Sequence, residues 1–217
     1  FQYDVAHVSL ANAADLMLIA PATANVIAKM AHGQADDMLT TVTLAAHCPK
    51  LVAPAMNTHM LENPITQDNI KTLEHYGFTV IPSGSGLLAC GDVGSGRLPE
   101  ESVLVNYVLR ELACEKDLAG KKVVVSAGAT QEPMDPVRYL TNHSTGKMGY
   151  ALARAAAMRG AEVTLIHGQT ALDPVRFVQD VPVTSAQQMY EAVSSRFADA
   201  DVLIMAAAVA DYRPAAV

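Results

Sequence analysis

The segment from Lys122 to Gly128 reads KVVVSAG, and it decides the fold of the second half of the chain. Three consecutive valines are typical of a strand buried in a parallel sheet, and the glycine after them is typical of a turn from strand to helix. Helical spacing follows at residues 147–159 and 187–197, and further apolar runs occupy residues 161–167 and 201–208. Alternating strands and helices predict an open parallel sheet covered by helices.

The first half of the chain repeats this alternation. Strands are predicted at residues 15–20, 50–54 and 78–82, the first of them stopped by a proline, with helices at 24–31 and 63–76. A further helix falls between Glu101 and Cys114, and the glycine-rich stretch from 84 to 96 is predicted to be a mobile loop that closes over a substrate. The charged segment 115–122 is the best boundary. We therefore predict an α/β protein of two Rossmann-like units, residues 1–120 and 121–217.

Composition excludes several classes of protein. The 217 residues carry 15 Lys and Arg against 22 Asp and Glu, a formal net charge of −7, so neither nucleic acid nor an anionic membrane is a predicted partner. No apolar run approaches the roughly 18 residues that span a bilayer. Three cysteines without metal-ligand or disulfide spacing predict no metal site and a reducing cytoplasm. A start at Phe1 and an end at Val217 indicate a fragment that lacks both ends.

Several polar residues of the first half lie where open sheets bind ligands, beyond the carboxyl ends of strands. Asn57 follows one strand, and Thr23 and Asn25 follow another, although helix capping explains such residues equally well. Cys90 in the glycine-rich stretch is a candidate acid or nucleophile, with a space-filling buried cysteine as the slightly favoured alternative. A lone histidine such as His7 is more often structural than catalytic.

The second half contains a polar turn, residues 142–146, that leads into a predicted helix. Thr141 stands where a P-loop requires its first glycine, so a P-loop is excluded, but the helix amides remain a possible phosphate site. A capping turn is the commoner explanation. Asp211 follows the third strand, where a carboxylate accepts from a ribose hydroxyl, while the small residues before it also suit close packing.

These separate signals match known families in one order. Residues 21–25 (PATAN), 54–57 (PAMN) and 89–91 (ACG) resemble the flavin-dependent cysteine decarboxylases. Residues 135–149 (DPVRYLTNHSTGKMG) and 208–212 (AVADY) resemble phosphopantothenate-cysteine ligase. Together they resemble the bacterial family of bifunctional enzymes of coenzyme A biosynthesis.

The resemblance implies two reactions. A ligase part uses CTP with Mg²⁺ to activate 4′-phosphopantothenate as an acyl-cytidylate, which cysteine attacks to form 4′-phosphopantothenoylcysteine. A decarboxylase part then uses FMN to oxidise the thiol-bearing carbon, and the resulting thioaldehyde accepts the electron pair released when CO₂ leaves. The reduced flavin afterwards returns the two electrons that it took in the oxidation, which gives 4′-phosphopantetheine with no net redox change. It also implies homo-oligomers, with a trimeric decarboxylase whose flavin lies near a subunit interface and a dimeric ligase.

The resemblance also assigns roles to residues. His7 is implied as a base, Asn57 as the holder of the substrate carboxylate, and Cys90 as a proton donor. Implied FMN contacts are Thr23 and Asn25. Asn142 is tied to the acyl-cytidylate, and the implied CTP site comprises Met205, Ala206, Ala207 and Asp211.

Two departures and two alternatives accompany this interpretation. The family's phosphate-binding loop for FMN would precede Phe1 and its lysine-rich ligase loop would follow Val217, so we expect this chain to bind FMN poorly and to turn over CTP weakly or not at all.

A nicotinamide-dependent oxidoreductase is the first alternative, although the full glycine fingerprint is missing. A noncatalytic flavin- or nucleotide-binding module is the other, and Cys90→Ser would leave its binding unaffected.

Overall fold

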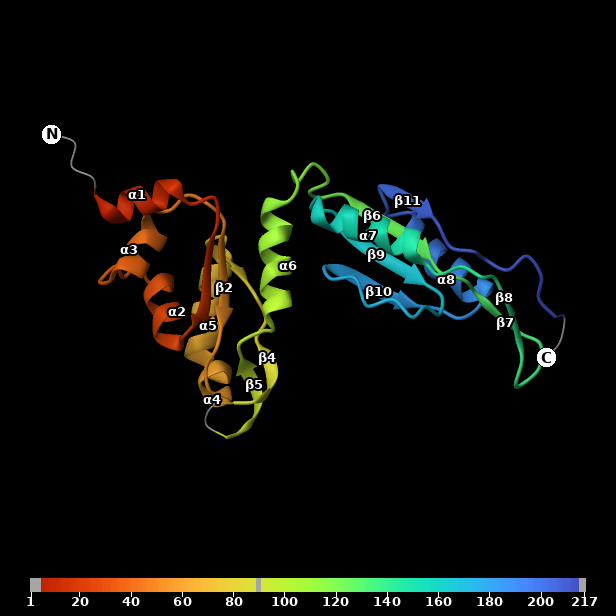
Figure 1. Cartoon of the computed structure of the whole chain (residues 1–217), viewed down its shortest axis with the longest axis horizontal. Helices are drawn as coiled ribbons and strands as arrows, with labels where there is room; N and C mark the ends of the chain where they lie inside the picture. Colours follow the sequence, from red (N-terminus) through yellow and green to blue (C-terminus); the bar gives the residue numbers. More distant parts are fainter. Residues whose placement is uncertain (1–4, 89–90, 215–217) are drawn as a thin grey trace. The chain divides into compact units, whose positions relative to one another are not determined.

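The computed structural model describes residues 5–88 and 91–214 of the chain. They form two compact units, Phe1–Leu112 and Ala113–Val217 (Figure 1). Both units contain an open parallel sheet, so the predicted α/β class is confirmed. Each unit has its own hydrophobic core.

The first unit has a three-stranded parallel sheet with helices on both faces. Its strands β1 (Met17–Ala22), β2 (Lys50–Pro54) and β3 (Thr79–Val80) lie in that order. Successive side chains of a strand point to opposite faces, so Val52 packs with α2 (Ala24–Ala31) and α5 (Pro64–His75), while Leu51 and Ala53 pack with α6 (Glu101–Leu112). Both faces of β2 are therefore buried, which explains its continuous apolar sequence.

Smaller elements complete this unit at the ends of the sheet. Helix α1 (Ala6–Ala13) packs against α3 (Met38–Ala45) through Ala11, Val42 and Ala46. The short helix α4 (Thr58–Glu62) follows β2, and β4 (Gly84–Leu87) pairs with β5 (Val93–Arg97) as an antiparallel hairpin. Figure 1 shows α1 and the α4–hairpin group at opposite ends of the unit.

The second unit has the strand order of a Rossmann half. Strands β6 (Lys122–Ala127), β9 (Glu162–His167), β10 (Val178–Pro182) and β11 (Val202–Met205) are all parallel, in the order β10-β9-β6-β11. Helix α7 (Lys147–Met158) packs on one face and α8 (Ala186–Phe197) on the other. The strand order reverses between β6 and β11, and the crevice at such a switch point is the usual ligand site of this fold.

The structure corrects three predictions about elements. Strand β1 does not stop before Pro21 but continues through it to Ala22. The glycine-rich stretch 84–96, predicted as a loop, contains the hairpin β4–β5. A second antiparallel hairpin, β7 (Gln131–Pro133) with β8 (Tyr139–Thr141), lies between β6 and α7 and was not predicted.

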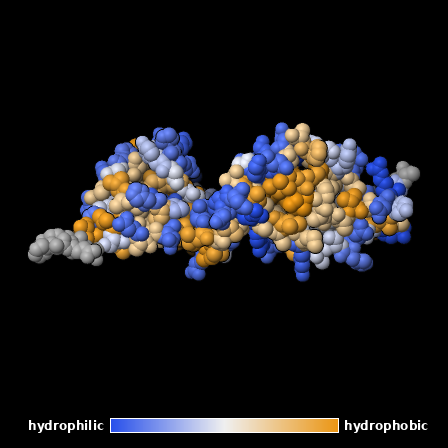
Figure 2. All heavy atoms as spheres, turned by 90° about the horizontal axis from the view of Figure 1, so that it is seen from above, coloured by the Kyte–Doolittle hydropathy of each residue, from blue (hydrophilic) through white to orange (hydrophobic). Residues whose placement is uncertain are grey.

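Surface hydropathy differs from place to place on the second unit. Figure 2 shows hydrophobic residues gathered over a broad area on one of its faces. The edge strand β11 contributes exposed apolar side chains, with Val202 at 41% and Met205 at 57% exposure.

Within residues 5–88 and 91–214, no helix combines the length and the apolar character needed to cross a membrane.

Helix α7 lies close enough to β6 that position 149 has no room for a side chain. A Cβ on Gly149 would lie 2.5 Å from the Cβ of Ala127 and 2.8 Å from the carbonyl oxygen of Ser126. We expect Gly149→Ala to lower the free energy of unfolding by about 2 kcal/mol, because helix and strand must separate. Urea denaturation measures this, and Met148→Ala, at a 71% exposed neighbour, is the control. Equal midpoints for the two variants would contradict the close packing.

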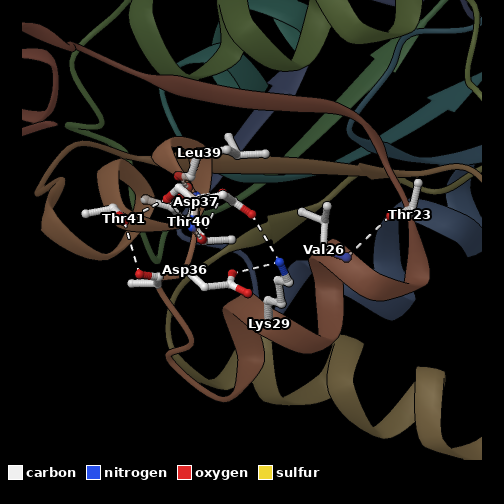
Figure 3. Close-up of polar contacts among 10 residues, drawn as sticks. Thr23, Val26, Lys29, Asp36, Asp37, Leu39, Thr40 and Thr41 are labelled. Carbon is white, nitrogen blue, oxygen red and sulfur yellow. Dashed lines mark hydrogen bonds and ion pairs between the residues drawn. The ribbon is translucent and has the colours of Figure 1, made fainter.

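A polar network fixes the connection between α2 and α3 (Figure 3). Lys29 on α2 donates to Asp36 at 2.7 Å and to Asp37 at 3.2 Å. Asp37 is the N-cap of α3: its Oδ1 accepts from Thr40 N at 2.8 Å, and the Thr40 hydroxyl accepts from Asp37 N at 3.3 Å. This capping box and the lysine hold residues 32–37 against two helices.

The Asp37 contacts predict a dependence of stability on pH. Hydrogen bonds from Thr40, and then from Lys29, lower the pKa of Asp37 below its ordinary value of 3.8. Because the pKa is lower in the folded state, the Asp37 carboxylate stabilises the fold when the pH is above its ordinary pKa. This stabilisation is lost as the pH falls through the folded-state pKa. Asp37→Asn keeps a capping oxygen without the charge. We expect its Tm deficit against wild type to shrink from about pH 5 to about pH 2; a constant deficit in thermal melts would contradict this.

Candidate functional site

The carboxyl ends of β1 and β2 border a cavity of about 450 Å³. Pro21 of β1 and residues 55–57, which follow β2, line one side of it. Leu87, Leu88 and residues 96–98, from the hairpin and its flanks, line the other. This is the edge at which open α/β sheets bind ligands, and the cavity is within the usual size range of small-molecule sites.

The hairpin forms the cavity wall because glycines let its backbone approach the loop after β2. Met56 N donates to Gly96 O at 2.9 Å, and the Thr58 hydroxyl donates to Ser95 O at 2.7 Å. A Cβ on Gly94 would lie 2.5 Å from the Thr58 hydroxyl oxygen, and one on Gly96 would overlap Met56 O. Gly96 also has φ +110°, which other residues rarely adopt. The sequence thus fixes the hairpin against residues 56–58.

Asn57 is both a helix cap and a cavity residue. Its Oδ1 accepts from His59 N at 2.9 Å, which makes it the N-cap of α4. Its Nδ2 donates to a carboxylate oxygen of Asp92 at 3.5 Å. The amide group of Asn57 therefore already lies beside a carboxylate. Asp92 was missed by sequence reasoning, although it directly follows the ACG motif at 89–91.

The two residues predicted to contact FMN lie at the start of α2. Thr23 is the N-cap, and its hydroxyl accepts from Val26 N at 3.3 Å, so the capping interpretation is confirmed for Thr23 (Figure 3). Asn25 is exposed in the first turn of the same helix. Capping uses the Thr23 oxygen as an acceptor and leaves the hydroxyl proton as a donor.

Within a single chain, His7 does not lie at this cavity. His7 is half-buried on α1, at the end of the unit opposite to α4 and the hairpin (Figure 1). Cys90, the other predicted catalytic residue, lies outside the described residues. Of the predicted decarboxylase residues, only Asn57 therefore lines the cavity as described.

In the second unit, close backbone contacts form the carboxyl edge of the sheet. Gly146, with φ +78°, is the N-cap of α7, and its Cβ position lies 3.3 Å from Gly128 Cα. No side chain caps α7; Ser144 instead accepts from Gly146 N at 3.3 Å. The predicted capping turn therefore supplies the N-cap residue of this helix, Gly146, but no capping side chain. Backbone N–H groups of its first turn have no side-chain cap, which suits an anion.

The predicted ligase residues do lie side by side. Asn142 Nδ2 is 3.3 Å from the carbonyl oxygens of both Ala208 and Val209, so the turn before α7 reaches the segment after β11. Ser126 Oγ accepts from Ala206 N at 3.1 Å and from Ala207 N at 3.2 Å, so both amides are occupied within the fold.

The remaining two predicted CTP residues, Met205 and Asp211, are exposed at the same edge. Asp135, in the loop between β7 and β8, belongs to the motif that carries the ligase resemblance. Hydrogen bonds from Val137 N and from Arg138 hold the pKa of the Asp135 carboxyl below its usual range. This carboxylate therefore stays charged at neutral pH and fixes the loop between β7 and β8. Among the described residues, no cluster of His, Cys, Asp and Glu is arranged to hold a metal ion.

Curated relatives that match nearly the whole chain share one description. The coenzyme A biosynthesis bifunctional protein CoaBC of Mycobacterium bovis is 52% identical over 98% of this chain and 52% of the relative. CoaBC of Bacillus subtilis is 50% identical over 97% of this chain and 52% of the relative. A solved PPC decarboxylase mutant complexed with pantothenoylaminoethenethiol is 40% identical, covers 48% of this chain and 59% of that chain, and has a TM-score of 0.48. The chain spans about half the length of the curated relatives it matches.

Family models match both units. A model described as the DNA/pantothenate metabolism flavoprotein C-terminal domain matches residues 118–217. A model described as Flavoprotein matches residues 1–113, which is more than half of the chain. The chain therefore belongs to the Flavoprotein family.

Proposed function

We propose that the first unit is the FMN-dependent decarboxylase part of an enzyme of coenzyme A biosynthesis, and that it converts 4′-phosphopantothenoylcysteine to 4′-phosphopantetheine. The observation that carries this proposal is the position of Asn57. Its amide lines a cavity at the carboxyl edge of the sheet and lies beside a carboxylate. A substrate that must lose a carboxylate needs a group of this kind to orient it.

The residues around this cavity fit FMN. Pro21 and Met56 offer an apolar surface for a flat ring, and Thr23 and Asn25 offer donors at the start of α2. FMN would supply reversible two-electron oxidation of the thiol-bearing carbon of the substrate. The protein binds and orients the two molecules, and the hairpin wall limits the access of water to them.

Asn57 is the residue whose proposed role its contacts support best. The substrate carboxylate would replace Asp92 as the acceptor for Asn57 Nδ2, because both are carboxylates and the present contact is long at 3.5 Å. Meanwhile Oδ1 stays engaged with His59 N and keeps the amide group oriented. Cys90 follows Leu88 of the cavity wall by two positions in the sequence, and we propose that it donates the final proton.

A matched pair of asparagines tests the role of Asn57. Asn63 is also an N-cap, with Oδ1 accepting from Ile65 N at 3.0 Å, but it does not line the cavity. Serine caps helices about as well as asparagine and has no amide. With excess FMN, we expect Asn57→Ser to lower kcat/KM for 4′-phosphopantothenoylcysteine about a hundredfold and to weaken its binding about tenfold, roughly 2.7 and 1.4 kcal/mol. Asn63→Ser should change neither. Equal effects of the two variants would overturn the proposal.

We propose that His7 reaches the cavity from a neighbouring copy of the chain. Its place on α1, at the opposite end of the unit, supports this, and so does the oligomer that the family resemblance implies. Chains carrying His7→Asn and chains carrying Asn57→Ser should each have little activity, while co-expression of the two should restore part of the activity in mixed oligomers. Inactive mixtures that contain verified mixed oligomers would overturn this arrangement.

We propose that the second unit contributes the CTP-binding edge of a phosphopantothenate-cysteine ligase, with Mg²⁺ bound together with the nucleotide. The switch point between β6 and β11, the uncapped start of α7 and the position of Asn142 beside Ala208 support it. In NMR titrations of the full chain, CTP with Mg²⁺ should shift amides at residues 144–149 and 205–211. Asn142→Ala should reduce these shifts, and Asn106→Ala on α6 should leave them unchanged. Shifts confined to other regions would contradict the assignment.

A further inference from the structure

The first unit contains a second cavity, of about 410 Å³, at the end of the sheet opposite to Asn57. Lys50, the first residue of β2, lines it, whereas the cavity described above begins where β2 ends. The other lining residues come from the end of α2, the connection to α3, α3 itself, and the segment before β3. The two cavities therefore lie at opposite ends of the strands of one sheet.

The walls of this cavity are fixed by contacts within the chain. Lys29, Asp36 and Asp37 fix the connection that carries Gly33 and Gln34, as Figure 3 shows for the three charged side chains. His32 Nδ1 lies 3.0 Å from Ala28 O. The Thr43 hydroxyl donates to Leu39 O at 2.8 Å. A site of this size with fixed walls is prepared for a small molecule before the molecule arrives.

Lys50 gives this cavity a positive charge. Its ammonium group donates to Ala46 O at 2.6 Å and to Cys48 O at 3.5 Å, and it lies 5.6 Å from the centre of the Phe78 ring. An ammonium group has three N–H donors, and two carbonyls account for two of them. Within the described part of the chain, no carboxylate forms an ion pair with Lys50.

The rest of the lining carries no carboxylate and includes several apolar side chains. Met30, Ala31, Leu44 and Phe78 are its apolar side chains, His32 and Tyr76 add aromatic rings, and Gln34, Thr40 and Thr43 are its uncharged polar members. A hydrated inorganic anion would gain little from such walls. A molecule with an apolar or aromatic body and one negative charge would cover the apolar walls and place its charge at Lys50.

We propose that this cavity is a second small-molecule site that binds an aromatic or branched-chain carboxylate, with the carboxylate at Lys50 and the apolar body against Phe78 and Leu44. The site is separate from the proposed decarboxylase cavity, so its occupancy does not depend on FMN. Its test needs no turnover, and its failure would leave the proposed decarboxylase function standing.

The first experiment uses 3-phenylpropanoate as the probe and ¹H–¹⁵N NMR of the full chain without FMN as the readout. We expect saturable shifts of the amides of Gly33, Gln34 and Leu44, with those of residues 55–57 unchanged. The alcohol 3-phenylpropan-1-ol has the same body without the charge and should bind at least tenfold more weakly. Equal affinity of acid and alcohol, or shifts centred on residues 55–57, would overturn the proposal.

Variants of the lining separate charge from shape. Lys50→Met should weaken binding of 3-phenylpropanoate at least tenfold, Lys50→Arg should retain most of it, and Lys71→Met, at an exposed lysine on α5, should leave it unchanged. Leu44→Trp fills a rim position that is 63% exposed, so this variant should fold and lose the probe. Thermal melts verify folding of each variant. Wild-type affinity in folded Lys50→Met or Leu44→Trp would overturn the site.

Discussion

Replacing Gly96 with alanine is expected to remove nearly all of the decarboxylase activity that we propose for the first unit, and to lower the free energy of unfolding by about 4 kcal/mol. The added Cβ would overlap the carbonyl oxygen of Met56, and the backbone φ of +110° disfavours any side chain. A backbone oxygen cannot rotate away as a side chain can. The hairpin must therefore move away from residues 56–58. Asn57 then loses the contacts that hold it in position.

The matched control for this prediction is Gly77→Ala. Gly77 also has a positive φ, +84°, but nothing lies within 4 Å of its Cβ position. The Gly77→Ala variant should lose only the free energy of the backbone strain, about 1 kcal/mol, and should keep activity near wild type. Urea denaturation and a mass-spectrometric assay of CO₂ loss measure the two effects. If Gly96→Ala behaved like Gly77→Ala, the hairpin would not be what positions Asn57.

The same hairpin shows where sequence reasoning succeeds and where it fails. Strands β2 and β6 are continuous apolar runs, so their burial in parallel sheets is predictable from local sequence. The stretch 84–96 contains many glycines and was therefore predicted as a loop. Gly96 is instead required because the backbone of Met56 passes within contact distance, and Gly94 because the Thr58 side chain does. Both neighbours lie far away in the sequence. Local propensity contains no signal for such a contact.

The candidate site was predictable to a similar degree. Asn57 and Thr23 were found because they follow strands, and the structure gives both a capping role. Asp92 forms its contact with Asn57 across 35 positions, so only the fold reveals the pair. The position of His7 away from the cavity was also not predictable from the sequence. The residues of a helix do not indicate at which end of a sheet the helix packs.

Removal of the Glu132 carboxylate is expected to have the second-largest effect, a loss of about 3 kcal/mol from the stability of the second unit. Glu132 lies on β7 and is only 2% exposed, and its Oε1 accepts from Ala186 N at 2.7 Å. Ala186 begins α8, so the carboxylate meets the positive end of a helix dipole. This contact connects the β7–β8 hairpin to the first residue of α8, over a separation of 54 positions, beside the bond from Gln131 N to Thr184 O at 2.7 Å.

Two variants separate the charge of Glu132 from its hydrogen bond. Glu132→Gln keeps an acceptor of the same length and should cost about 1 kcal/mol, the part due to charge. Glu132→Leu leaves Ala186 N without its partner in a buried place and should cost the full amount. Hydrogen exchange adds a local readout, since amides at the start of α8 should lose protection in Glu132→Leu before those of β6. Because β7 leads to β8 and then to Asn142, the leucine variant should also weaken the CTP–Mg²⁺ shifts at residues 205–211. Unchanged stability in Glu132→Leu would mean that other contacts, and not this carboxylate, attach the hairpin to α8.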